Sequence, residues 1–245
     1  MVKFYTLGTS HGGTEPGRSC SVNMVSVDDN YYIFDCGGNV ETKLRDLNIP
    51  FENIKAVFIS HMHEDHVGSL SAIVKRFSHY IKAERSVKIF MPEENGIEVF
   101  KSWMAALHTT ENLHRISYEL IAAGEIYSDE NVRVTAIRTR HLLSGKFPSY
   151  AFMIEAGGKR LLYTGDLAYD FSDYPEVLYN ESFDLVVSEL VHFSLEDNLA
   201  DIKRTKTKHL VFTHMGPKKA LALREVIGEF PFKVDVAEDN DVFEA

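Results

Sequence analysis

Long apolar runs are missing from this 245-residue sequence. No stretch approaches the ~18 consecutive apolar residues that a membrane-spanning helix needs. The opening MVKFYTLGTS also lacks the apolar core of a secretory signal. We therefore expect a soluble, cytoplasmic protein with no membrane partner.

Cysteine is nearly absent as well. The sequence has only Cys20 and Cys36 and no CxxC pair, which excludes a disulfide framework and a thiolate metal cluster. A reducing compartment fits this composition. Because 44% of the residues are hydrophobic, the chain can bury a large core without a disulfide or a structural metal. A set of metal ligands would therefore serve chemistry rather than folding.

An excess of positive charge is the third feature that is missing. The chain has 26 Lys and Arg against 36 Asp and Glu, which gives a formal net charge of −10. Extended nucleic-acid binding is not expected, because such a surface needs clustered Lys and Arg. A small anion site is compatible with this charge. The oligomeric state is left open by the sequence, and a homodimer would be unsurprising.

Short β-type runs alternate with helical runs, and no repeat or linker divides the chain. This alternation predicts one α/β domain over residues 1–245. The AGGK segment at 156–159 predicts a hairpin, so the sheet should be mixed. Strands are expected at 3–7, 22–27, 31–35, 56–60, 87–91, 116–121, 132–138, 150–155, 160–164, 185–188, 209–212 and 233–236. Helices are expected at 41–47, 69–77, 97–106, 195–205 and 218–227.

The strongest local signal is HMHEDH at 61–66, between an apolar strand and a helix. Residues i and i+2 of an extended segment point the same way, so His61 and His63 can face one metal ion. The turn into the helix lets Asp65 and His66 point at a second position nearby. Packing does not explain this cluster, because Asp is almost never buried without a partner.

Three later residues follow predicted strands in the same manner: His141, Asp166 and His214. Each one alone could be an ordinary polar residue at a strand end. Together with the cluster at 61–66 they predict the completion of a metal site, because ends of central strands are where α/β folds assemble their sites.

In this order the motifs resemble those of the metallo-β-lactamase superfamily, and the similarity runs from position 35 to 214. It rests on Asp35 in YYIFDCG, on HxHxDH at 61–66, on His141, on Asp166 in TGD and on His214. The resemblance implies a four-layer αβ/βα sandwich with metals at one edge. It also implies that Asp35 does not touch metal but fixes the motif loop or a His N–H group.

The same resemblance implies a ligand assignment. One metal would be held by His61, His63 and His141. The other would be held by Asp65, His66 and His214, and Asp166 would bridge the two ions. Nitrogen and oxygen donors of this kind suit zinc first, with manganese or iron as the other options.

Two such ions predict a hydrolase. Divalent ions about 3.5–4 Å apart clamp a bridging water and lower its pKa from ~15.7 towards ~7, so hydroxide is present at neutral pH. With Asp65, Asp166 and the hydroxide counted, the site keeps about one positive charge. A small anionic substrate such as a phosphodiester is favoured, and a neutral ester or lactam stays open.

Other residues are candidates for catalysis and substrate contact. The leaving group must be protonated, and Glu189 and His192 follow the predicted strand at 185–188. Asp65 could orient the nucleophile. Ser10 and His11 belong to a loop rich in Gly and hydroxyl groups, whose backbone N–H groups could approach an anion.

The segments 7–19 and 188–193 are similar to those of the transfer-RNA 3′-processing endonucleases (tRNase Z) and related phosphodiesterases. Only 24 residues separate His141 from Asp166, which leaves no room for the long arm with which those enzymes grip RNA. We therefore expect a small or cyclic phosphodiester substrate. The alternatives are a tRNA endonuclease without the arm, a single-iron dioxygenase acting on a thiol or persulfide, and a non-catalytic metal-binding module.

Overall fold

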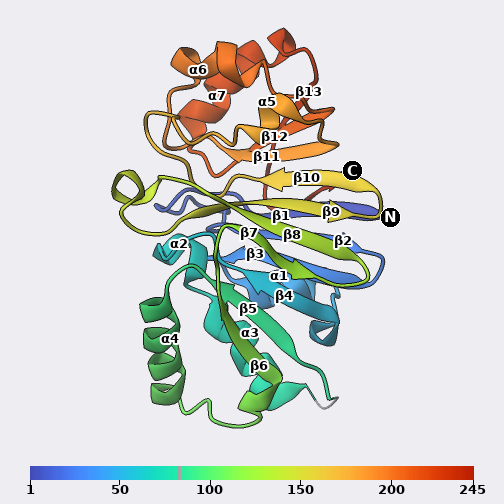
Figure 1. Ribbon diagram of the computed structural model, residues 1–245, viewed down its shortest axis with the longest axis vertical. Coiled ribbons are helices and arrows are strands. Elements are labelled where there is room, and N and C mark those ends of the chain that lie inside the picture. The colour runs from blue at the N-terminus through green and yellow to red at the C-terminus, as the bar shows by residue number, and fades with distance from the viewer. Residues whose placement is uncertain (82–83) are drawn as a thin grey trace.

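The computed structural model describes residues 1–81 and 84–245. Two sheets, each of seven strands in the described residues, face each other, and helices cover the outer side of both (Figure 1). Apolar side chains fill the space between the sheets and the space under each helical layer. The predicted four-layer sandwich is confirmed.

The first sheet has the strand order β14-β1-β2-β3-β4-β5-β6. Its strands are β1 (Val2–Gly8), β2 (Val22–Val27), β3 (Asn30–Cys36), β4 (Ile54–Phe58), β5 (Val87–Met91), β6 (Ile116–Leu120) and β14 (Asp241–Glu244). The pairs from β14 to β3 are antiparallel, and the pairs from β3 to β6 are parallel. The sheet is therefore mixed, as predicted.

The second sheet has the order β13-β12-β11-β10-β9-β8-β7. Its strands are β7 (Gly124–Ser128), β8 (Val132–Arg138), β9 (Tyr150–Ala156), β10 (Lys159–Tyr163), β11 (Leu185–Glu189), β12 (His209–Thr213) and β13 (Lys233–Val236). The predicted hairpin joins β9 and β10 through Gly157 and Gly158, whose φ angles are 54° and 76°. Such left-handed pairs match the twist of a two-residue hairpin, and Gly adopts them without strain.

Two groups of helices form the outer layers (Figure 1). The first sheet is covered by α1 (Val40–Asp46), α3 (Leu70–Lys75) with the π-helical segment Arg76–Tyr80, and α4 (Glu94–Ala106). The second sheet is covered by α5 (Val177–Asn180), α6 (Leu195–Ile202) and α7 (Pro217–Val226). The short helix α2 (Glu64–Val67) lies at the edge of the sheets. None of the helices in the described residues is both long and apolar enough to cross a membrane.

Aromatic rings from both sheets meet in the central layer. Phe34 and Phe58 stack with ring centroids 5.0 Å apart, and Phe152 of the opposite sheet lies 5.9 Å from Phe58. Aromatic pairs of this kind contribute about 0.5–1.5 kcal/mol beyond the burial of their area. The layer holds the two sheets rigidly, and Phe58 is the last residue of the strand that leads into HMHEDH.

Two strands, β7 and β14, were not predicted. Both are edge strands with half-exposed sequences, GEIYS and DVFE, and carry too few apolar residues to show a strand pattern. The predicted helix at 195–205 ends at Ile202, because Thr205 and Thr207 turn the chain back towards β12. The other predicted elements lie within a few residues of their observed positions.

Candidate metal centre

The predicted ligands converge on one edge of the sandwich. His61 follows β4, His141 follows β8, Asp166 follows β10 and His214 follows β12. The strands β8, β10, β11 and β12 run in the same direction, so their carboxyl ends meet at this edge. Sites form at such edges because the sheet is rigid while the loops vary freely.

All seven predicted ligands lie together in two groups. The potential ligand atoms within each group are no more than 4.8 Å apart. The first group is His61, His63, His141 and Asp166. The second group is Asp65, His66 and His214. The HMHEDH segment supplies both groups because it is extended at His63 and helical from Glu64, so its side chains diverge.

Asp166 lies between the two groups and faces each with a different oxygen. Its Oδ2 is 3.6 Å from Nε2 of His61 and 3.7 Å from Nε2 of His141. Its Oδ1 is 3.3 Å from Nε2 of His66 and 3.4 Å from Nε2 of His214. One carboxylate can therefore serve two metal positions at once.

Four of the imidazoles have their Nδ1 atom beside an oxygen that lies outside the two groups. The pairs are His61 with Ser60 Oγ at 3.0 Å, His66 with Asp35 Oδ2 at 2.7 Å, His141 with the Leu167 carbonyl at 3.1 Å and His214 with the Ser10 carbonyl at 3.0 Å. An Nδ1–H group donating outward leaves the Nε2 lone pair free and facing inward. Histidine ligands of metals are held in this way in general.

Three of the inward-facing atoms have no hydrogen-bond partner among the described residues. Nε2 of His61, Nε2 of His66 and Oδ1 of Asp166 are buried and accept or donate no hydrogen bond. Unpaired polar atoms in a protein interior cost free energy, and nearly all of them have a partner. Imidazole and carboxylate are donors that suit a divalent ion. The residues fit a bound metal, and the centre is a site for divalent metal ions.

Asp35 lies behind the ligands and is fully buried. It accepts hydrogen bonds from the Ser60 amide at 2.7 Å, the Ser60 hydroxyl at 2.8 Å and the Tyr163 hydroxyl at 2.7 Å, besides its contact with His66. Tyr163 was not predicted, because a tyrosine inside a strand looks like any core residue. Ser60 had a weak signal, since it directly precedes His61.

The backbone around the centre adopts unusual conformations. Asp35 and His214 have φ angles of 62° and 49°, and such left-handed residues cost about 1–3 kcal/mol each. Gly37 lies so close to α2 that an added Cβ would be 1.6 Å from the carbonyl oxygen of Asp65. Only glycine allows the loop after β3 to pass this close to the predicted metal ligand Asp65.

The charged state of the cluster follows from its burial and its carboxylates. Burial, together with the charge of His66, holds the pKa of His61 well below its usual value. Burial would lower the pKa of His66, but the charges of Asp166 and Asp35 outweigh it and raise the pKa well above its usual value. Burial would raise the pKa of Asp166, but the surrounding imidazoles hold it well below its usual value.

The two predicted proton donors differ in accessibility. Glu189 is 1% exposed, and its oxygens accept from the amides of Leu167, Val191 and His192 and from Nδ1 of His192. His192 lies against the cluster, with Nδ1 3.7 Å from Asp166 Oδ2. Burial would lower the pKa of His192, but its hydrogen bond to Glu189 and the charge of that carboxylate raise it. His192 is half-buried and therefore more accessible than Glu189, and a proton-donor role for either residue stays a prediction.

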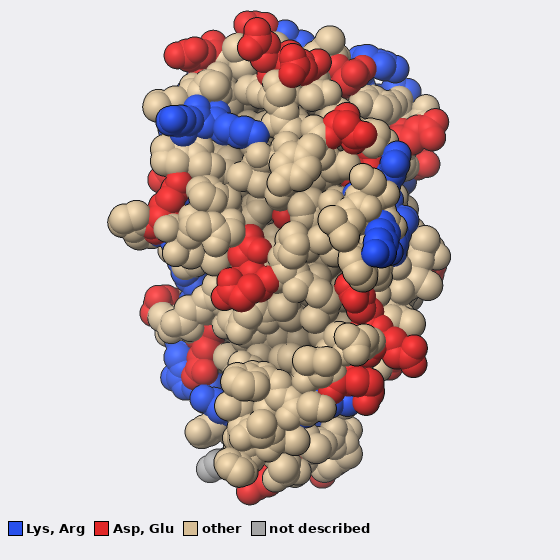
Figure 2. Space-filling model, turned by 90° about the vertical axis from the view of Figure 1, so that its left-hand side faces the viewer, with Lys and Arg blue, Asp and Glu red and all other residues tan. Residues whose placement is uncertain are grey.

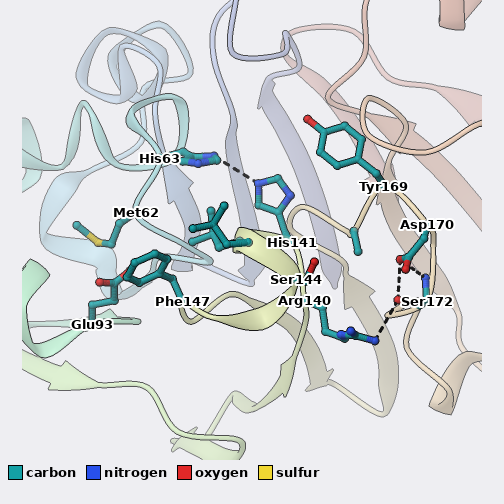
Figure 3. A pocket seen from close by; sticks show the side chains of 13 residues that line it. Met62, His63, Glu93, Arg140, His141, Ser144, Phe147, Tyr169, Asp170 and Ser172 are labelled. Carbon is teal, nitrogen blue, oxygen red and sulfur yellow. Dashed lines mark hydrogen bonds between the residues drawn. The ribbon is translucent and has the colours of Figure 1, made fainter.

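A pocket of about 760 Å³ opens beside His63 and His141 (Figure 3). Its other lining residues are Met62, Glu93, Arg140, Leu142, Leu143, Ser144, Phe147, Ala168, Tyr169, Asp170 and Ser172. Phe147 and Tyr169 come from different loops, and both keep a large exposed fraction. The sequence did not indicate these residues, because side chains on variable loops follow no periodic pattern.

Ser10 and His11 lie in the loop after β1. Ser10 is fully buried and supports His214 through its carbonyl oxygen. Nδ1 of His11 accepts from the Gly13 amide at 3.1 Å, and its Nε2 lies 3.5 Å from Glu15. Neither residue lines the pocket in Figure 3, so substrate contact by Ser10 and His11 stays a prediction.

Comparison with known proteins agrees with this geometry. The family model described as "Anti-Pycsar protein Apyc1" matches residues 2–225. The chain belongs to this family. An Apyc1 protein of Bacillus phage vB_BsuM-Goe3 is 25% identical over 150 residues, which cover 56% of this chain and 57% of that protein.

The chain is also similar to two proteins that are not described as Apyc1. A ribonuclease Z of Listeria monocytogenes is 29% identical over 133 residues, covering 53% of this chain and 42% of that enzyme. The metallo-β-lactamase fold protein YhfI from Bacillus subtilis has a TM-score of 0.79 at 22% identity, with both chains fully covered. The predicted metallo-β-lactamase fold is thereby confirmed. The matched stretch spans about half the length of the Apyc1 and ribonuclease Z relatives, so their activities reach this chain only as a proposal.

Proposed function

We propose that this chain is a metal-dependent hydrolase that cleaves a small or cyclic phosphodiester with two divalent ions. The carrying observation is the position of Asp166, which faces one histidine group with Oδ2 and the other with Oδ1. Membership of the Apyc1 family and the likeness to ribonuclease Z support phosphodiester chemistry. The presence of two separate groups of potential ligands supports a site for two ions rather than one.

Zinc is the first choice of metal, with manganese or iron as alternatives. The donors are imidazole and carboxylate, which suit all three metals. The free, buried cysteines Cys20 and Cys36 support a reducing, cytoplasmic location. Metal analysis of the purified protein tests the metal assignment directly.

The pocket supports a substrate of nucleotide size. Its volume lies within the roughly 300–1,000 Å³ that is usual for small-molecule sites. Phe147 and Tyr169 offer aromatic surfaces for a flat ring, and Arg140 offers a cation for an anionic group. A cyclic nucleoside monophosphate combines all of these features. Figure 2 shows the face of the molecule that lies on the left-hand side in Figure 1. On this face the basic side chains lie towards the edges rather than in the middle, which argues against binding of an extended nucleic acid.

The side chains of the protein position the attacking water and supply a proton to the leaving group. When bound, two divalent ions supply Lewis acidity and lower the pKa of water from ~15.7 towards ~7. Asp65, whose Oδ2 lies 3.6 Å from Nε2 of His66 and 3.7 Å from Nε2 of His214, would orient the attacking water. His192 donates a proton to the leaving oxygen as the P–O bond breaks, which balances the proton that the attacking water loses. Glu189 holds the His192 ring in place and raises its pKa.

Hydrolysis assays on a graded set of substrates test this function. We expect turnover of bis(4-nitrophenyl) phosphate and of adenosine 3′,5′-cyclic monophosphate by the metal-loaded protein. The His61→Ala variant provides the background, and equal rates for the two proteins would refute the phosphodiesterase proposal. Faster cleavage of a 3′-extended precursor tRNA than of either small ester would favour the endonuclease alternative. One iron per chain with no hydrolysis would favour the dioxygenase.

A further inference from the structure

The loop between β11 and α6 carries His192 and is held from two sides by opposite charges. The loop is short, since β11 ends at Glu189 and Ser194 caps α6. Both of its ends are fixed by secondary structure. The position of the His192 ring therefore depends on how the few backbone groups between them are held.

The carboxylate of Glu189 accepts hydrogen bonds from the N–H groups of this loop. Its Oε2 accepts from the Val191 amide at 2.7 Å and from the His192 amide at 2.9 Å. Its Oε1 accepts from Nδ1 of His192 at 2.8 Å. One buried carboxylate thus fixes both the backbone and the ring of His192.

The ammonium group of Lys219 donates hydrogen bonds to backbone carbonyl groups of the same loop. Its Nζ donates to the Val191 carbonyl at 2.7 Å and to the Phe193 carbonyl at 2.7 Å, which are the carbonyls on either side of His192. Lys219 belongs to the first turn of α7, five residues after His214. It therefore ties the loop that carries His192 to the helix that directly follows the predicted metal ligand His214.

We propose that Lys219 is a positioning residue that holds His192 over the metal-ligand cluster by clamping both flanking carbonyls. The proposal rests on the function proposed above, because it gives His192 the role of proton donor. The His192 ring lies 4.4 Å from the His141 ring and 6.2 Å from the His214 ring, between centroids. A shift of the loop would carry the ring away from the leaving oxygen.

A lysine suits this task because its hydrogen bonds are charge-assisted. Such bonds are roughly twice as strong as hydrogen bonds between neutral partners. Lys219 is half-buried, and burial lowers its pKa, which the charge of Glu189 opposes. Without the ammonium group the two carbonyls would lose their partner, and the loop could relax. A misplacement of about 1 Å near a reacting group can cost on the order of 100-fold in rate.

Two substrates with different leaving groups test the clamp. An alkoxide leaving group, as in adenosine 3′,5′-cyclic monophosphate, needs a proton donor, whereas 4-nitrophenolate needs little help. We expect Lys219→Met to lower kcat for the cyclic nucleotide about tenfold or more. The same variant should keep bis(4-nitrophenyl) phosphate turnover within about twofold and leave the metal content unchanged. Lys218→Met, at the exposed neighbouring position, serves as the control and should behave as wild type.

A double-mutant cycle with His192→Ala separates positioning from general damage. If Lys219 acts through His192, Lys219→Met should add no further loss in the His192→Ala background. The proposal is overturned by wild-type kcat in Lys219→Met, by equal losses on both substrates, or by the same fold loss in both backgrounds. If His192→Ala itself hydrolyses the cyclic nucleotide at the wild-type rate, the proton-donor role in the proposed function fails instead.

Discussion

The carboxylate of Asp35 lies 2.7 Å from Nδ1 of His66, although 31 positions separate the two residues. The pair joins the end of β3 to α2, and both side chains are fully buried. Asp35 also accepts hydrogen bonds from Ser60 and Tyr163, so one carboxylate ties together two strands and the HMHEDH segment. His66 can present only Nε2 to the interior of the cluster.

Asp35→Asn should weaken metal binding without removing a ligand. The amide has one acceptor oxygen in place of two, so it cannot keep all the hydrogen bonds that orient His66 and Ser60. Loss of such an outer contact usually costs 10–100-fold in metal affinity. Competition with a chromogenic chelator measures the change. Asp29→Asn, on an exposed turn, is the control, and an affinity of Asp35→Asn within about twofold of the control would contradict the prediction.

Asp166→Ala should lose most of the bound metal, because its two oxygens face the two ligand groups. Elemental analysis after gel filtration gives the number of ions per chain for wild type, for Asp166→Ala and for the exposed control Asp46→Ala. Full occupancy in Asp166→Ala would show that the remaining histidines suffice and that the carboxylate does not bridge. Loss of metal in the control would point to damage by charge removal alone.

The seven metal-cluster residues could be predicted because metal binding restricts the residue types. Three His and one Asp within six positions suit few environments except a metal site, and each later candidate followed a strand that ends at the same edge. Tyr163 and Lys219 could not be predicted in this way. A tyrosine in a strand and a lysine in a helix fit many environments, and only the folded chain brings them to Asp35 and to the Val191 carbonyl.

The walls of the pocket escaped prediction for a related reason. Phe147 and Tyr169 lie on loops, where neither a period of 2 nor one of 3.6 reports the direction of a side chain. Leu143 and Ser144 have left-handed φ angles of 45° and 56°, which no residue preference indicates. The fold class depends on summed patterns over many strands and was predictable, whereas a pocket depends on single conformations.

Phe147→Ala should raise KM for adenosine 3′,5′-cyclic monophosphate about fivefold or more, because stacking of a base on an aromatic ring contributes about 1–3 kcal/mol. The value of kcat should stay within about twofold, since Phe147 is not among the residues that hold metal or His192. Steady-state kinetics on the cyclic nucleotide measure both constants. Tyr80→Ala removes an aromatic ring that is 57% exposed and does not line the pocket, and it should change neither constant. A fall in kcat with unchanged KM would show that Phe147 acts on the reaction rather than on the base.

A partly buried carboxylate, Asp129, joins the two sheets far from the metal cluster. Its Oδ2 accepts from the hydroxyl of Tyr32 in the first sheet and of Tyr127 in the second, both at 2.7 Å. Its Oδ1 accepts from the amides of Asn131 and Val132. Burial would raise the pKa of Asp129, but the hydrogen bond from Tyr32 and the other three outweigh it, so the pKa is lowered.

The lowered pKa of Asp129 fixes the sign of a pH effect on stability. A carboxyl group whose pKa is lower in the folded chain stabilises it above the unfolded value of about 3.9, and this contribution is lost as the pH falls through the folded value. Asp129→Asn should therefore lower the free energy of unfolding at pH 7 by about 1–2 kcal/mol. Urea titrations of wild type and variant should show this difference shrinking below pH ~4. Because both proteins share the same metal cluster, its own acid sensitivity cancels in the difference. A difference in the free energy of unfolding that stays constant from pH 7 to pH 3 would contradict this prediction. It would mean that the hydrogen bonds from Tyr32 and Tyr127 stabilise the fold independently of the charge on Asp129.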